Sequence, residues 1–151
     1  MALVKGLLTD GKPIVEITLA DATPAPREVS AADEATPFQV RPYRALLDTG
    51  ATITCLCDHV VTECKLRPYG FERVIGALGP SLHQTYIVRT GIVCGDLSDP
   101  HGVDRGLFQL EPLEAAVIRD NQWFDLIVGT DVLSRHEFAL TRGGGFTLTL
   151  Y

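Results

Sequence analysis

An apolar run leads directly into a carboxylate and a glycine in Leu46-Leu47-Asp48-Thr49-Gly50-Ala51. A carboxylate at the end of a buried strand is unfavourable unless hydrogen bonds hold it. The hydroxyl of Thr49 and the open backbone around Gly50 supply such bonds, because glycine has no side chain to keep other groups away. The stretch therefore predicts one ionisable oxygen pair held rigidly in apolar surroundings, although the same tripeptide also suits an ordinary turn between two strands.

Two carboxylates that are brought together in such surroundings cannot both ionise easily, so they share one proton and titrate as a pair. This is the acid/base pair of aspartic proteolysis. The chain has 151 residues and a single Asp-Thr-Gly, at positions 48–50. We therefore expect half of a two-carboxylate site in this chain, with twofold symmetry supplying the other half from a second copy.

The overall composition is that of one globular domain, which we expect to span residues 1–151. Apolar residues make up 46% and charged residues 21%, and the net charge is −6, with 13 Lys and Arg against 19 Asp and Glu. We see no basic cluster of the kind that contacts phosphates, so the sequence predicts no nucleic-acid partner. It also has no run near the roughly 18 apolar residues of a membrane span, so we expect no membrane partner. Met1 to Gly6 do not resemble the start of a signal peptide, and we expect the cytoplasm as location.

The sequence contains four cysteines, which we expect to be free thiols that fill small apolar gaps in a reducing compartment. Cys55, Cys57 and Cys64 lie close together, but their spacing is not the paired Cys-x-x-Cys of closed zinc sites. None of the four histidines pairs with an obvious nucleophile, and Trp123 is predicted to lie in the core. The sequence therefore predicts no metal and no cofactor.

Short β-rich segments separated by turns dominate the chain and predict a mostly β barrel or sandwich. Residues 2–8 and 14–19 are expected to form a hairpin around the turn at 9–13. Residues 21–42 carry four prolines and predict a loop insertion that covers the site, is cleaved, or simply lies on the surface. Further strands are expected at 44–47, 53–56, 85–93, 115–118, 124–129, 138–140 and 146–150, a hairpin tip at 73–80, and helices at 58–66, capped by Asp58, and at 130–136.

Several motifs, in order over roughly residues 14–150, resemble those of the retropepsin-like aspartic proteases. Residues 46–51 are similar to the catalytic signature of that family. The run at 134–140 resembles most closely the retroviral-like domain of the eukaryotic DNA-damage-inducible proteins. Three further segments look like the family's flap, the strand beyond it, and its second glycine element with a helix: Val74-Ile75-Gly76-Ala77-Leu78-Gly79, Thr90-Gly91-Ile92-Val93-Cys94-Gly95 and Leu126-Ile127-Val128-Gly129-Thr130-Asp131-Val132-Leu133.

The resemblance implies a closed acid-protease barrel with one or two short helices and pseudo-twofold halves. It implies an obligate homodimer in which the two Asp48 carboxylates, one protonated, activate a water for peptide hydrolysis. Thr49 and Gly50 would complete the catalytic loop, with Thr49 bonding across the dimer. A peptide in an extended conformation would bind as an added strand beneath the flap. The substrate-binding residues implied in this way are Ala51, Thr52, Val74, Ile75, Gly76, Ala77, Leu78 and Gly79.

Two departures from the family pattern keep other functions open. Retroviral members often carry an Asp after the signature Ala and an Arg after the second Gly, where this chain has Thr52 and Thr130. The flap-like segment lacks a Gly-Gly pair and is followed by Pro80. The alternatives are a dimeric binding or structural module of the same fold with weak catalysis, and a protease limited to its own precursor or to one partner.

Overall fold

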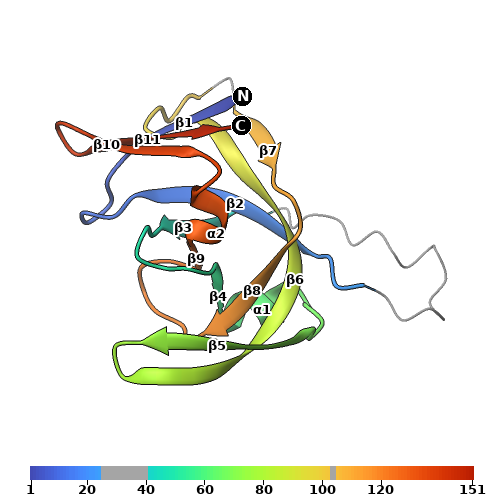
Figure 1. Ribbon diagram of the computed structural model, residues 1–151. Coiled ribbons are helices and arrows are strands. Elements are labelled where there is room, and N and C mark those ends of the chain that lie inside the picture. The colour runs from blue at the N-terminus through green and yellow to red at the C-terminus, as the bar shows by residue number, and fades with distance from the viewer. Residues whose placement is uncertain (25–40, 103–104) are drawn as a thin grey trace, which may run out of the picture.

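The computed structural model describes residues 1–24, 41–102 and 105–151, and this part of the chain is mostly β (Figure 1). Most of the predicted insertion at 21–42 lies outside the described residues. The elements in chain order are β1 (Ala2–Leu7), β2 (Ile14–Asp21), β3 (Tyr43–Leu47), β4 (Cys55–Cys57), α1 (Asp58–Glu63), β5 (Gly70–Gly76), β6 (Gly79–Asp96), β7 (Gly106–Gln109), β8 (Leu113–Ile118), β9 (Leu126–Val128), α2 (Thr130–Leu133), β10 (Glu137–Thr141) and β11 (Gly145–Leu150).

The long strand β6 organises the sheet. It pairs with β1, β2, β5, β7 and β8 along its length. The strands follow the order β10-β11-β1-β6-β2-β3-β9-β4-β8, with β5 and β7 off this path and paired with β6. The pairing of β8 with β6 brings the path back to β6. Figure 1 shows β6 curving along one side of the molecule, with the β5–β6 hairpin projecting at one end.

The predicted hairpin between residues 2–8 and 14–19 is wrong. The turn itself forms, with a bridge between Thr9 and Lys12 and positive φ angles at Asp10 and Gly11. Beyond it the two strands separate, because β1 pairs with β11 and β6 whereas β2 pairs with β3 and β6. A local turn signal fixes a chain reversal but not the distant partners that each strand takes.

The core lies on the inward faces of these strands. In β2 the alternate residues Val15, Ile17 and Leu19 are buried, as the period of a strand requires. All four cysteines are buried and free, so the prediction of free thiols is confirmed. Trp123 was expected in the core but is 45% exposed, and the ammonium of Lys12 lies 5.4 Å from the centre of its ring.

Both helices are shorter than the sequence predicts. Helix α1 ends at Glu63, and its N-cap is Cys57, so the predicted cap Asp58 is instead the first helical residue. Asp58 still suits that place, because a negative charge in the first turn interacts favourably with the helix dipole. No helix in the described ranges is long and apolar enough to cross a membrane.

Candidate active site

Asp48 lies in a tight turn at the end of the buried strand β3. Its carboxylate is half-buried, and its Oδ1 accepts a hydrogen bond of 2.8 Å from the backbone N–H of Gly50. The N–H of Ala51 donates to the Asp48 carbonyl oxygen at 3.2 Å. A Cβ atom at position 50 would lie 3.2 Å from Oδ1, so glycine gives the carboxylate room. The turn therefore fixes one carboxylate at the edge of the sheet, next to the exposed Thr49 and Gly50.

A second glycine-containing loop packs directly against the Asp48 turn. Strands β3 and β9 are parallel neighbours, and the Asp48 N–H donates to the Val128 carbonyl oxygen at 3.0 Å. Gly129 follows, and a Cβ there would lie 2.7 Å from the carbonyl carbon and oxygen of Ile53. The Thr130 N–H completes the contact by donating to the Ala51 carbonyl oxygen at 2.8 Å. The two apolar strands ending in glycine that the sequence indicates are thus brought together.

Thr54 and Asp131 join these two loops from behind, and sequence reasoning assigned neither residue to the site. The Thr54 hydroxyl donates to Asp131 Oδ1 at 2.9 Å and accepts from the Gly129 N–H at 3.2 Å. The Thr54 N–H donates to Asp131 Oδ2 at 2.9 Å. The two residues are 77 positions apart, so no sequence window contains both. The one available signal was the place of Asp131 just after the glycine of the second loop.

The residues predicted to close over a substrate form the tip of the β5–β6 hairpin. The strands pair from Gly70 with Thr85 up to Gly76 with Gly79, and Gly79 has a φ of +104°. Ile75 is 80% exposed and Leu78 is fully exposed. Large apolar side chains at a hairpin tip add nothing to the packing of a single chain, so they are free to contact something else.

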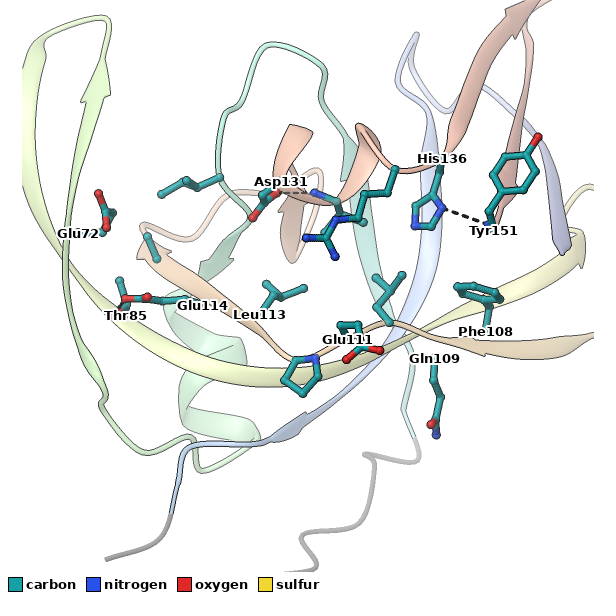
Figure 2. Close-up of a pocket in the computed structure, with 16 residues that line it drawn as sticks. Glu72, Thr85, Phe108, Gln109, Glu111, Leu113, Glu114, Asp131, His136 and Tyr151 are labelled. Carbon is teal, nitrogen blue, oxygen red and sulfur yellow. Dashed lines mark hydrogen bonds between the residues drawn. The ribbon is translucent and has the colours of Figure 1, made fainter.

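A cavity of about 510 Å³ lies beside these loops (Figure 2). Figure 2 shows it running from Glu72 of the hairpin, past Thr85 and Glu114, to His136 and Tyr151 at the other end. Ile53 and Asp131 line it, and they connect it to the loops that hold Asp48, whereas Asp48 itself is not among its lining residues. The space is therefore next to the candidate carboxylate rather than around it.

The cavity wall includes the chain end. The Tyr151 N–H donates to His136 Nδ1 at 3.2 Å, and the Tyr151 hydroxyl donates to Glu137 at 2.7 Å. Burial, with a smaller effect of the nearby Arg135 charge, holds the pKa of His136 below its ordinary value. His136 is therefore neutral near pH 7 and accepts the backbone hydrogen bond.

A second group of reactive side chains lies at the N-terminus of α1. Cys57, His59 and Asp120 place one ligand atom each within 4.8 Å of one another. His59 Nδ1 lies 2.6 Å from Asp120 Oδ1, and its Nε2 lies 2.7 Å from Asp125 Oδ1. Burial opposes the charged imidazole, but these two carboxylates outweigh it and raise the pKa of His59. The sequence reasoning missed this group because its members meet only through strand pairing.

The fold is similar to that in a crystal structure of a retropepsin-like aspartic protease from Rickettsia conorii. The match covers 97% of this chain and 89% of that chain, with a TM-score of 0.54 and 12% sequence identity. No protein-family model matches the sequence, and no curated protein matches it. The mostly β architecture is thus of the retropepsin-like kind, and at this identity the likeness concerns the fold alone.

Proposed function

We propose that the chain is a homodimeric aspartic endopeptidase whose active site contains Asp48 from each of two copies. The observation that carries this proposal is the position of Asp48, at the end of a buried strand and hydrogen-bonded to the second glycine loop, in a retropepsin-like fold. A carboxylate in this position has a rigid backbone and one open side. A second copy related by a twofold axis would present the same open side to it.

In the proposed reaction the two Asp48 carboxylates share one proton and hold a water between them. The ionised carboxylate takes a proton from the water as the water oxygen attacks the peptide carbonyl carbon. The protonated carboxyl group donates a hydrogen bond to the carbonyl oxygen and so polarises the carbonyl group. Transfer of a proton to the leaving nitrogen then accompanies cleavage of the C–N bond. Thr49 and Gly50 would hold the two loops in register, with Thr49 bonding to the partner loop.

The proposed substrate is a peptide in an extended conformation. It would lie beside Ala51 and Thr52 and beneath the hairpin tip at 74–79, adding a strand through main-chain hydrogen bonds. The exposed Ile75 and Leu78 support this role, because closure over a substrate would remove their apolar surface from water. In this proposal Val74, Gly76, Ala77 and Gly79 shape the backbone of the closing segment.

The second candidate function is a dimeric binding module of the same fold with weak catalysis. Thr52 and Thr130 favour it, because neither can form the supporting ion pair of many retroviral members. In this structure Thr130 joins the loops through its backbone N–H instead. A protease restricted to its own precursor or to one partner is the third candidate.

The deciding experiment compares wild type with Asp48→Asn on an unbiased peptide library. Cleavage by the wild type that Asp48→Asn abolishes, with unchanged circular dichroism, is the expected result. Asp99→Asn is the matched control, since Asp99 is an exposed carboxylate that accepts a bond from the His101 N–H of its own turn. Equal cleavage by wild type and Asp48→Asn would refute the proposal.

Two other outcomes would support the alternative functions. No cleavage of the library together with specific cleavage of one partner would support the restricted protease. Peptide binding without cleavage would support the binding module.

The broader features of the proposal are a single domain over residues 1–151 and a closed barrel with pseudo-twofold halves. The return of the strand path to β6 supports the barrel. The four buried free thiols support a reducing compartment such as the cytoplasm. A particular relation to the DNA-damage-inducible proteins, and the lack of a nucleic-acid partner, rest on the sequence motifs and on the charge of −6.

A further inference from the structure

We propose that Cys57, His59 and Asp120 form a binding site for one divalent transition-metal ion of the zinc type, with Asp125 orienting His59. The site is separate from the Asp48 loop, and it goes beyond the proposed proteolysis. Its function would be to fasten helix α1 to the connection between β8 and β9.

The sheet topology explains why these residues meet. Strands β4 and β8 are parallel, and Cys57 pairs with Ile118 at their carboxyl ends. Parallel strands end at the same edge of a sheet, so the residues that follow β4 lie beside those that follow β8. His59 follows β4 in the first turn of α1, and Asp120 follows β8. The pairing thus brings Cys57 and His59 to a residue more than 60 positions away.

The donor atoms converge on one point. The Cys57 sulfur faces the β8–β9 connection, where Asn121 Nδ2 lies 3.5 Å from it and the Phe124 carbonyl oxygen lies 3.6 Å from it. His59 faces the same connection, and its backbone N–H donates to Asp120 Oδ1 at 3.0 Å. Ligand atoms of one zinc ion lie about 3–4 Å apart, given bonds of roughly 2.0–2.3 Å. The three donor atoms here lie within 4.8 Å of one another. A metal ion would replace the 2.6 Å contact between His59 Nδ1 and Asp120 Oδ1, and the half-exposed Asp120 side chain has room to move as it does so.

Asp125 supplies the outer partner that metal-binding histidines usually have. With His59 Nδ1 toward the metal, Nε2–H donates to Asp125 Oδ1 at 2.7 Å. The other oxygen of Asp125 accepts the Arg44 N–H at 2.7 Å, and its backbone N–H and carbonyl oxygen bond to Arg44 and Cys57. Asp125 is therefore fixed against β3 and β4, and it fixes both the tautomer and the ring plane of His59.

The ligand types select the metal. One sulfur, one imidazole nitrogen and one carboxylate oxygen form a mixed set that suits zinc or cobalt rather than calcium or magnesium, which prefer oxygen alone. Two carboxylates flank a single imidazole, so the site carries excess negative charge that a divalent cation neutralises. Binding releases the thiol proton of Cys57 and any proton on His59 Nδ1, because the thiolate and the unprotonated imidazole nitrogen are the forms that ligate. Three protein ligands leave one position for water.

The test is a titration of the full chain, freed of metal by chelation, with Co²⁺. We expect one equivalent to bind and to give the near-ultraviolet absorption of a cobalt-bound thiolate. Cys57→Ser removes that absorption. Asp125→Asn weakens the binding about 10- to 100-fold, as loss of an outer partner does at other metal sites. Cys94→Ser is the matched control, since Cys94 is also buried and free but lies on β6.

Asp120→Asn provides a second test if Cys57→Ser fails to fold, because Asp120 is about half exposed and its replacement leaves the core intact. We expect this variant to keep the wild-type circular dichroism and to bind Co²⁺ at least tenfold more weakly. The proposal is overturned if the folded wild type binds no stoichiometric Co²⁺ or Zn²⁺, or if the thiolate absorption persists in Cys57→Ser. Each of these experiments measures metal binding and none measures peptide cleavage. A negative result would therefore refute the metal site without bearing on the proposed proteolysis.

Discussion

Gly129 is the residue at which the two loops of the candidate site approach most closely. A Cβ atom at this position would lie 2.7 Å from the Ile53 backbone and 2.9 Å from the Ala51 carbonyl oxygen. Backbone atoms cannot rotate away, so Gly129→Ala must separate the loops. We expect a loss of about 1–3 kcal/mol in the free energy of unfolding, measured with urea.

Gly106→Ala is the control for this substitution, because no atom of the described residues lies within 4 Å of a Cβ there and no unusual φ is required. It should leave stability within about 0.5 kcal/mol of wild type. Equal effects of the two substitutions would show that the loops are not packed as described. In the proposed enzyme Gly129→Ala should also lower kcat, since the Asp48 N–H is bonded to the residue before it, Val128.

Between elements, Asp21 at the end of β2 is paired with Arg67, which follows α1. Arg67 Nε lies 2.6 Å from Asp21 Oδ2, and the Thr23 N–H donates to Oδ1 at 3.1 Å. Burial alone would raise the pKa of Asp21, but these bonds outweigh it and hold the pKa below its ordinary value. Their contribution to stability is therefore complete above about pH 4 and is lost as the pH falls through the folded-state pKa.

Asp21→Asn tests this linkage. We expect the variant to be less stable than wild type at pH 7 by about 1 kcal/mol, the upper end for a pair whose arginine is half exposed. The difference should shrink below pH 4, as urea unfolding at a series of pH values would show. A difference that stays constant down to pH 2 would mean that Asp21 ionisation does not stabilise the fold.

A substitution at the exposed tip of the β5–β6 hairpin can test substrate binding without changing the stability of the fold. Leu78→Ser should leave the free energy of unfolding within about 0.5 kcal/mol of wild type, because the side chain is fully exposed. If the hairpin closes over a peptide, the same change should raise KM at least about tenfold, since burying a leucine contributes about 1.5–3 kcal/mol and about 1.4 kcal/mol is a factor of ten. Ile92→Ala, buried on the same strand β6, should instead cost about 2–5 kcal/mol of stability. An unchanged KM for Leu78→Ser would remove the hairpin tip from the binding site.

The elements also show how far sequence patterns reach. Alternation and glycine predict most strands, the hairpin tip near Gly79, and the carboxylate at the end of β3. They do not predict that β1 pairs with β11 instead of β2, or that β6 continues unbroken over 18 residues. Both features depend on pairing between strands that are far apart in the sequence. Thr54 with Asp131, and His59 with Asp120, were missed for the same reason. Trp123 was misplaced because an aromatic residue predicts burial only on average.

For the whole molecule, the proposed function requires two Asp48 residues and hence two chains. Mixing wild type with inactive Asp48→Asn tests this requirement directly. At equal amounts and free exchange, active wild-type pairs form about one quarter of all dimers in the mixture. The same wild-type chains without the variant would form about twice as many active dimers, since all of them would pair with one another. We therefore expect the activity per wild-type chain to fall to about half, and to about one quarter with a threefold excess of the variant. Asp99→Asn mixed in the same ratios should leave activity undiminished. If Asp48→Asn also leaves it undiminished although exchange is shown by light scattering or subunit labelling, each chain acts alone, and a site shared across a twofold axis is excluded.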